Sequence, residues 1–234
     1  RFASRLRKAT REATTELLLA IPEHLYPELE DDLREAVDRD VAVFLLLGQV
    51  EDPPSDGSEY AGAASVVRYW DESLPLVYTV DDAAAMIGDS TIVSGPHTDD
   101  VAVTVSEPQL SGSILGMYFS AYWPAATELY VTEPDPLPKT YDWFRQATLH
   151  ATLHEQAGVD LYADIETEGG TLLSGPVTEI RQAFIEPTTN DFTLENSFIV
   201  DTDRGLVSVG GRGSFIEDYQ SQSVRLRRLD AVET

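Results

Sequence analysis

The amino-acid sequence predicts an α/β domain followed by a small, all-β antiparallel domain. In the first part of the chain, amphipathic helical patterns alternate with fully apolar segments of strand length, which is typical of a sheet covered by helices. After residue 158 the helical patterns end, and short alternating segments separated by turns take their place. We therefore expect the α/β domain over residues 1–158 and the β domain over residues 159–234.

The N-terminal elements follow the order of a parallel βαβ unit. Residues 1–17 have the pattern of an amphipathic helix and concentrate the positive charge of this end of the chain. The apolar residues 18–21 predict a short buried strand, and residues 22–40 place four apolar side chains on one helix face. Residues 41–48, VAVFLLLG, predict a second strand that is buried on both faces of the sheet.

Short strands and two more helices complete the predicted α/β domain. After a loop at 51–64, strands are expected at 65–70, 74–81, 83–89, 91–95 and 101–105. Residues 107–126 predict a helix with an aromatic end, which Pro124 closes. A proline-rich break at 133–138 precedes the last predicted helix, residues 139–158.

The rest of the chain has the alternation typical of strands. The strand-like segments are residues 159–185, 191–202, 206–211 and 215–229. Turns are expected at Gly169–Gly170, Thr188–Asn190 and Asp203–Gly205, because glycine and asparagine adopt the backbone conformations that tight turns need.

The composition is strongly acidic. The chain has 41 Asp and Glu against 16 Lys and Arg, a formal charge of −25, and only two lysines, Lys8 and Lys139. With a normal apolar content of 42%, this balance predicts a halophilic protein. Molar salt shortens the Debye length to about 3 Å from about 10 Å at 0.1 M and so screens carboxylate repulsion. An acidic patch for a basic partner is the alternative, but the acids are spread along the whole chain. Such a surface does not attract nucleic acid by itself.

Several classes of protein are excluded by what the sequence lacks. There is no cysteine, so disulfides and thiolate chemistry are unavailable. The longest apolar run, residues 41–48, is too short to span a membrane. No signal peptide is visible, and we expect a cytoplasmic protein. The chain begins at Arg1 without a methionine, which suggests a fragment whose N-terminal part is missing.

Residues 209–220, VGGRGSFIEDYQ, form a glycine-rich segment that could hold a ligand. A P-loop is excluded because no lysine lies nearby. A dinucleotide-binding loop is excluded because Ile216 stands where the third glycine is required, and because a strand-like pattern follows instead of a helix. From these residues alone, a plain turn between two strands and a ligand-binding loop both remain open.

Two further patterns indicate chemistry only weakly. His150 and His154 are four residues apart on one helix face, a spacing that can bind zinc, but the catalytic H-E-x-x-H order and a third ligand are missing. Surface or interface histidines are therefore favoured, and no metal or cofactor is expected. Glu195 and Glu217 could form the carboxylate pair of a glycosidase, but carboxylates are so abundant here that any such pair is weak evidence.

Three stretches together resemble the effector-binding region of the TrmB family of archaeal sugar-responsive transcriptional regulators. They are GMYFSAYWPAA, LENSFIVD and VGGRGSFIEDYQ. The resemblance covers nearly the whole chain and implies a linker helix, a phospholipase D-like α/β domain and a small β domain, with a sugar bound at their junction. It also implies operator DNA as a partner, through an N-terminal winged-helix domain that this sequence lacks, and a possible homodimer.

The resemblance also implies which residues bind the sugar. Motif by motif, recognition falls on a serine of the helix that ends in Trp-Pro, an asparagine of a strand, and the glycine loop with its glutamate: Ser120, Asn196, Gly211 and Glu217. Arg212, Phe215 and Ile216 line the same loop. Arg212 and Phe215 replace smaller or uncharged residues of sugar-binding relatives, which leaves a charged effector such as a sugar phosphate open.

The phospholipase D-like part is expected to be a scaffold and not an enzyme. Activity in that superfamily depends on an H-x-K motif, and the strands at 74–89 contain neither histidine nor lysine. The leading hypothesis is therefore the sugar-sensing domain of a transcriptional regulator. A carbohydrate-active enzyme and a module that only dimerises are the alternatives.

Overall fold

The computed structural model describes residues 2–89 and 102–231, and the chain divides into two compact units, Arg1–Thr132 and Glu133–Thr234. This boundary lies before the one expected at Gly158. Residues 133–158 belong with the C-terminal unit because helix α4 (Phe144–Gln156) packs its apolar side chains into the β core of that unit. The strand expected at 91–95 lies outside the described residues.

The N-terminal unit is a mixed seven-stranded sheet in the order β6-β5-β4-β1-β2-β3-β7. Its strands are β1 (Glu16–Pro22), β2 (Ala42–Gly48), β3 (Val66–Tyr69), β4 (Leu76–Val80), β5 (Ala84–Gly88), β6 (Ala102–Val105) and β7 (Thr127–Val131). The three strands β1, β2 and β3 pair in parallel, and the remaining pairs are antiparallel. The predicted βαβ unit is confirmed, whereas an all-parallel sheet is not formed.

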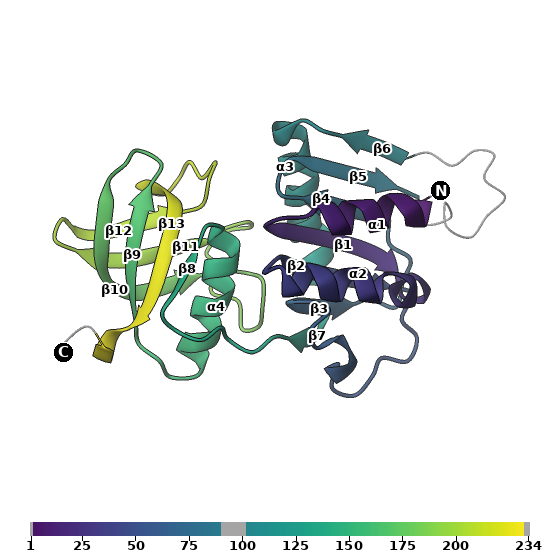
Figure 1. The fold of residues 1–234 in the computed structure, drawn as a ribbon, viewed down its shortest axis with the longest axis horizontal. Coiled ribbons are helices and arrows are strands. Elements are labelled where there is room, and N and C mark those ends of the chain that lie inside the picture. The colour runs from purple at the N-terminus through teal and green to yellow at the C-terminus, as the bar shows by residue number, and fades with distance from the viewer. Residues whose placement is uncertain (1, 90–101, 232–234) are drawn as a thin grey trace. The chain divides into compact units, whose positions relative to one another are not determined.

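Helices cover the two faces of this sheet. They are α1 (Phe2–Glu12), η1 (Glu23–Leu25), α2 (Tyr26–Asp38), η2 (Ser58–Tyr60), α3 (Pro108–Met117), the π-helical turn η4 (Tyr118–Tyr122) and η5 (Trp123–Ala125). Helices α1 and α2 lie side by side over β1 and β2 (Figure 1), where Leu19 shares a core with Leu29. On the other face, the rings of Phe44 and Trp123 meet edge-on at 5.9 Å. Both faces of β1 and β2 are therefore buried, as their apolar sequences predict.

Some elements differ from the sequence expectation. The helix expected at 107–126 changes from α to π to 3-10 geometry, and Pro124 lies in the first positions of the 3-10 turn. Strand β7 was not predicted, although it pairs with β3 along the sheet edge. The helix expected from residue 139 begins only at Phe144, because residues 139–141 form strand β8 instead.

The Asp81 side chain links the turn between β4 and β5 to the start of β1 through hydrogen bonds. Its carboxylate accepts hydrogen bonds of 2.8–3.2 Å from the backbone N–H groups of Thr14, Thr15 and Glu16 and from both threonine hydroxyls. Burial raises the pKa of Asp81, but these hydrogen bonds lower it, and the net pKa lies below the ordinary value. The φ angle of 53° is a left-handed conformation that Asp and Asn tolerate better than most residues.

The C-terminal unit is a closed β barrel with one helix. Its elements are β8 (Lys139–Tyr141), α4, β9 (Leu161–Thr167), β10 (Leu172–Arg181), β11 (Ser197–Thr202), β12 (Gly205–Gly210), β13 (Tyr219–Arg228) and η6 (Leu229–Ala231). The strand order is β12-β11-β10-β9-β13-β8, and a short parallel pairing of β12 with β13 closes the barrel. All its other pairs are antiparallel. The predicted fold class, an α/β domain followed by a small and mainly antiparallel β domain, is confirmed.

Helix α4 completes the barrel core. Phe144 and Ala147 are buried together with Phe198 of β11 and Val209 of β12. The rings of Phe144 and Phe198 lie 4.9 Å apart. The N-terminal end of α4 is therefore packed against β11 and against β12, the strand that leads into the glycine-rich segment.

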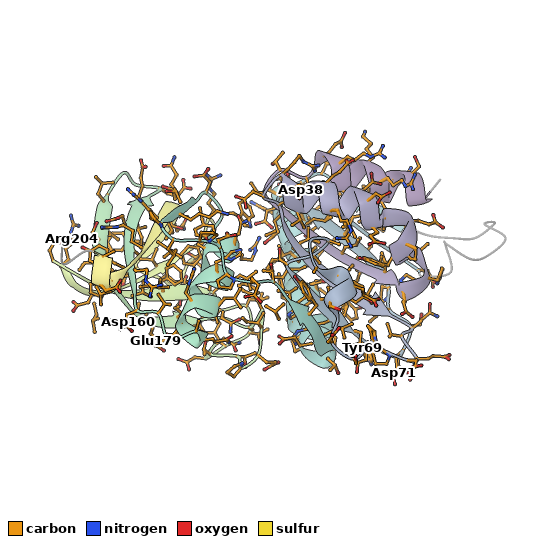
Figure 2. The ribbon with its side chains drawn as sticks, turned by 60° about the horizontal axis from the view of Figure 1, so that its bottom comes forward. Asp38, Tyr69, Asp71, Asp160, Glu179 and Arg204 are labelled. Atoms are coloured by element: carbon orange, nitrogen blue, oxygen red, sulfur yellow. The ribbon has the colours of Figure 1, made fainter. Side chains whose placement is uncertain are left out.

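Acidic side chains are exposed on both units. Asp38 and Asp71 belong to the N-terminal unit, and Asp160 and Glu179 to the C-terminal unit (Figure 2). Exposed Asp and Glu side chains are thus present on both units, in agreement with the spread of acidic residues along the sequence.

Candidate functional site

The glycine-rich segment forms a fixed loop between two neighbouring strands. Strand β12 ends at Gly210, and β13 begins at Tyr219. A turn is closed by the N–H of Ser214, which donates to the carbonyl of Gly211 at 3.2 Å. Gly213 has a φ of +78°, which side-chain-bearing residues rarely adopt. The Gln220 side chain donates to the Ser214 carbonyl, so the loop is tied back to β13.

The two acidic residues of the loop have different tasks. Asp218 is structural, since its carboxylate accepts hydrogen bonds from the backbone N–H and the hydroxyl of Ser208 at 2.8 and 3.0 Å. Its own N–H donates back to the Ser208 hydroxyl at 2.9 Å. Glu217 is half-buried, and among the described residues no hydrogen bond or ion pair engages its carboxylate. The loop therefore uses one carboxylate to hold its shape and leaves the other available.

Gly210 allows polar side chains to gather over the backbone at this point. A methyl group added there would lie 2.7 Å from Ser214 Oγ and 2.9 Å from the carboxyl carbon of Glu217. Both side chains are thus packed directly above the Gly210 Cα. At Gly211, an added methyl group would lie 3.1 Å from Cβ of Phe144, so the loop also passes close to the start of α4.

Three buried polar atoms around this loop lack hydrogen-bond partners within the described part of the chain. They are Asn196 Oδ1, Ser214 Oγ and Trp143 Nε1. Asn196 precedes Ser197, which pairs with Gly210, and Trp143 precedes Phe144, which contacts Gly211. An unpaired buried polar group costs about 1–3 kcal/mol, so such groups call for a partner such as water or a ligand. Together they offer an acceptor, a hydroxyl and an N–H donor.

The other predicted loop residues are more exposed. The Arg212 guanidinium pairs with Glu168, with Nε 2.9 Å from Oε1. Phe215 and Ile216 have 90% and 60% of their surface exposed, so within the C-terminal unit they form the tip of the loop and not a lining.

Ser120 belongs to the N-terminal unit, whereas the other six predicted site residues belong to the C-terminal unit. It lies exposed on η4, between the buried residues Phe119 and Trp123. Single π-helical turns are frequent at functional positions of helices, because they re-aim one side chain. The structure thus places Asn196, Gly211 and Glu217 close together in the C-terminal unit. Ser120 belongs to the N-terminal unit.

The histidine pair has a structural role. His150 and His154 are buried, contrary to the surface or interface position expected for them, and both bind Asp135. His150 Nδ1 accepts a hydrogen bond from the Asp135 N–H at 3.1 Å, and His154 Nε2 lies 2.8 Å from the Asp135 carbonyl. Lys139 Nζ and the Tyr141 hydroxyl reach the Asp135 carboxylate at 2.7 and 3.1 Å. The residues that the structure describes contain no group of three potential metal ligands.

Glu195 is also structural. Its side chain is 4% exposed, and its carboxylate accepts hydrogen bonds from Arg181 Nη1 at 3.1 Å and from the Asp191 N–H. A carboxylate held in this way is not free to act with Glu217 as a glycosidase pair.

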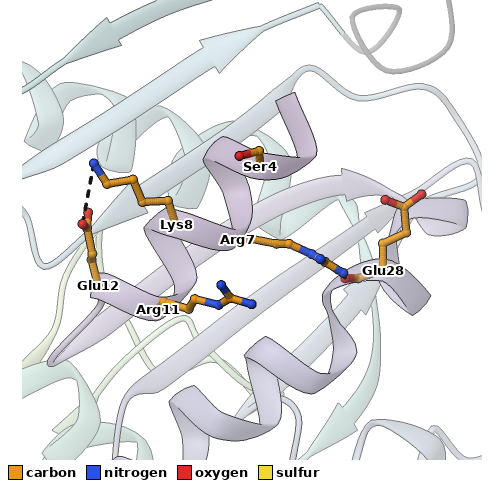
Figure 3. A pocket seen from close by; sticks show the side chains of 6 residues that line it. All are labelled: Ser4, Arg7, Lys8, Arg11, Glu12 and Glu28. Carbon is orange, nitrogen blue, oxygen red and sulfur yellow. Dashed lines mark hydrogen bonds and ion pairs between the residues drawn. The ribbon is translucent and has the colours of Figure 1, made fainter. Parts of the chain in front are cut away.

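A hollow on the N-terminal unit is lined by residues of α1 and α2 (Figure 3). Its cations are engaged by neighbouring groups. Arg7 donates to the Glu28 carbonyl at 2.9 Å, Arg11 pairs with Asp32 at 2.7 Å, and Lys8 pairs with Glu12 at 3.7 Å. The unpaired polar groups around the glycine loop distinguish that loop from this hollow. No helix among the described residues is long and apolar enough to cross a membrane.

Comparison with known families places both units in one class of protein, the transcriptional regulators. Residues 2–130 match the family described as "Transcriptional regulator TrmB, EBD N-terminal subdomain", where EBD denotes the effector-binding domain. Residues 136–229 match "TrmB/TrmBL1, EBD C-terminal subdomain". The chain therefore belongs to the TrmB family, and the division between the two matches agrees with the boundary between the two units.

Similar solved structures include an archaeal protein and two bacterial ones. TrmBL2, an archaeal chromatin protein, is 22% identical, with a TM-score of 0.41 over 53% of this chain and 48% of its own. Nuc, a phospholipase D family member from Salmonella typhimurium, is 17% identical, with a TM-score of 0.42 over 55% of this chain and 90% of its own. NucT from Helicobacter pylori is 10% identical, with a TM-score of 0.42 over 53% and 89%.

The match spans about half the length of TrmBL2, and these similarities concern the fold alone. None of the curated proteins matches the chain significantly.

Sequence reasoning missed three residues of the loop region. Gly210 was not separated from Gly211, although both stand in the Gly-Gly pair of the motif. Ser214 lies inside the quoted motif and could have been noted as a hydroxyl between a glycine turn and Glu217. Trp143 carries no signal in the sequence, because its place near the loop depends on how α4 packs against the barrel.

Proposed function

We propose that this chain is the effector-binding part of a TrmB-like transcriptional regulator and that its effector is a sugar. The observation that carries the proposal is the group of polar atoms around the glycine loop that are unpaired among the described residues, together with the carboxylate of Glu217 beside Ser214. A polyol needs many directional hydrogen bonds, and glycines expose backbone groups that can supply some of them. Membership of a regulator family that has an effector-binding domain supports the same conclusion.

Each residue would contribute a distinct kind of bond. Glu217 would accept hydrogen bonds from two hydroxyl groups, as a carboxylate without another partner can. Asn196 would accept through Oδ1, and the Gly211 backbone would allow the ring to approach closely. Ser120, which the family resemblance implies as a sugar ligand, would donate or accept a hydrogen bond through its hydroxyl. Phe215 and Ile216, exposed at the loop tip, would contribute apolar contact once a ligand is bound.

The proposal includes the rest of a regulator. Operator DNA would be bound by a winged-helix domain outside these residues, and the protein would act as a homodimer in the cytoplasm of a halophilic archaeon. Catalysis is not part of the proposal, because residues 74–89 contain neither the histidine nor the lysine of the phospholipase D motif.

Calorimetric titration of the chain with neutral sugars tests the proposal. We expect saturable binding of at least one sugar and no turnover of it. Turnover would support a carbohydrate-active enzyme instead, and no binding of any sugar would leave a dimerisation module.

The residue-level test is Glu217→Gln. Hydrogen bonds to a charged group contribute about 1.5–3 kcal/mol, so the exchange should weaken binding about ten- to a hundredfold. The melting temperature should stay close to that of the parent, because none of the residues that the structure describes bonds to this carboxylate. Glu166→Gln, at an exposed position of β9, removes the same charge and should leave the affinity unchanged. Equal affinities of parent and Glu217→Gln would refute the site.

A further inference from the structure

The glycine loop carries one cation, and a residue outside the loop holds it. Arg212 stands between Gly211 and Gly213, and residues 209–220 contain no other Lys or Arg. Its Nε lies 2.9 Å from Oε1 of Glu168, which follows β9 at the turn toward β10. The two side chains keep 59% and 43% of their surface exposed, so the pair lies at the surface of the unit.

Glu168 is itself held in a fixed position. Its N–H donates to the Gln220 carbonyl at 2.8 Å, which ties the turn to β13 directly after the glycine loop. Thr167 closes the same turn, because its carbonyl accepts from the Gly170 N–H at 2.8 Å and its hydroxyl accepts from the Thr171 N–H at 2.9 Å. The backbone that carries the Glu168 side chain is thus fixed beside the start of β13.

This arrangement sets the charge around the proposed ligand. Arg212 is neutralised by Glu168, whereas Glu217 has no cationic partner among the described residues. The polar atoms left for a ligand are therefore those of neutral groups and one carboxylate. A carboxylate without a compensating cation accepts hydroxyl protons but repels a phosphate group.

We infer that Glu168 is a specificity-determining residue, which restricts the site to uncharged polyols by holding Arg212 away from the ligand. The inference rests on the proposed function, and it adds the charge class of the effector and the residue that controls it. Without Glu168, Arg212 would be a free guanidinium beside Gly211, and a guanidinium is the side chain best suited to bind phosphate through two parallel hydrogen bonds. An exposed ion pair is weak, so a single exchange at Glu168 is enough to release the arginine.

The test compares the parent with Glu168→Gln, titrated with glucose, mannose and galactose and with their 6-phosphates at one fixed salt concentration. The parent should bind at least one neutral sugar and bind its 6-phosphate at least about tenfold more weakly. In Glu168→Gln the affinity for the 6-phosphate should rise about three- to fivefold, which is the gain that release from an exposed ion pair allows, while the affinity for the neutral sugar should stay the same.

Two control variants make the result specific. Glu166→Gln removes the same charge from the same hairpin and should leave the selectivity of the parent unchanged. The double variant Glu168→Gln with Arg212→Gln should lose the gain in phosphate binding, because the released guanidinium is the group that provides it.

The outcomes separate this inference from the proposed function. A parent that binds no sugar overturns the proposed function. A parent that binds neutral sugars, together with a Glu168→Gln variant of unchanged selectivity, overturns the inference alone. A gain that persists in the double variant, or one that Glu166→Gln reproduces, also overturns it, since general charge removal would then be the cause.

Discussion

Gly210→Ala adds a single methyl group at the point where the site's polar side chains meet the backbone. The new carbon would lie 2.7 Å from Ser214 Oγ, 2.8 Å from Ser214 Cβ and 2.9 Å from the Glu217 carboxyl carbon. Real Cβ atoms do not approach other atoms this closely, so the loop must move by several tenths of an ångström. The φ angle of Gly210 is not left-handed, so crowding and not backbone strain is the cause.

The expected effect is larger on binding than on stability. Overpacking a rigid core costs about 1–3 kcal/mol of unfolding free energy. A surface loop can shift to relieve the crowding, so the loss for Gly210→Ala should be about 1 kcal/mol or less. Displacing Glu217 forfeits hydrogen bonds worth about 1.5–3 kcal/mol, and sugar affinity should fall about ten- to a hundredfold. Calorimetry gives the affinity, and thermal unfolding gives the stability.

Gly112→Ala is the matched control, because a methyl group there meets no atom within 4 Å. It lies in α3, where the exchange should stabilise the protein by about 0.5–1 kcal/mol and leave sugar binding unchanged. Parent-like affinity of Gly210→Ala for the sugar would refute the reasoning, since it would mean that Ser214 and Glu217 can move aside without consequence.

Three further predictions concern stability. Asp81→Asn should lower the unfolding free energy at neutral pH by about 1–3 kcal/mol. Because the folded-state pKa of Asp81 is lowered, its contribution is present above the ordinary value of 3.8 and is lost as the pH falls below it, so parent and variant should converge in acid-unfolding curves. Asp135→Ala should destabilise the C-terminal unit by about 1–3 kcal/mol in denaturant melts, because the hydrogen bonds that Lys139 and Tyr141 donate to Asp135 are lost, and an unchanged midpoint would contradict the anchoring role. Melting temperatures should be higher in molar KCl than in dilute buffer if the acidic surface is a halophilic adaptation, and equal values would reject that idea.

The buried strands of the N-terminal unit could be predicted from the sequence because their own apolar residues indicate burial. Strands β1 and β2 are continuous apolar runs, and only a sheet covered on both faces accommodates two such runs joined by an amphipathic helix. Strand β7, TELYV, has no such signal, because it lies at an edge and forms through its pairing with β3. Strand β8 likewise depends on β13, whose paired residues lie 83 to 87 positions later in the chain.

The domain boundary could not be read from the helical pattern. Helix α4 follows the N-terminal domain in sequence and has the composition of an α/β helix, but its partners are the strands that come after it. The histidine pair is a similar case. Four-residue spacing is compatible with a metal, with a surface and with a structural anchor, and only the folded chain reveals that Asp135 lies between the two rings.

For the candidate site, the motif indicated the loop but not the role of each charge in it. Glu217 and Asp218 are adjacent in sequence and chemically alike, and the difference between them comes from Ser208 on β12, which bonds to Asp218. Arg212 looks like an anion-binding residue until Glu168, 44 positions earlier, is seen to hold it. A sequence motif does not show an ion pair between residues that are far apart in the chain.

The same contacts explain why such a loop could bind a small ligand well. A loop that had to be ordered by its ligand would lose affinity to the entropy of that ordering. Here Asp218 and Gln220 hold the loop through hydrogen bonds to β12 and to the loop backbone. Glu217 is left unpaired among the described residues, and Ser214 Oγ lacks a partner, so the groups that would meet a sugar are already in place before it arrives. The fixed shape of the loop and the polar atoms that it leaves unpaired among the described residues therefore have one origin: Asp218 and Gln220 make the structural hydrogen bonds, and Glu217 and the Ser214 hydroxyl remain available.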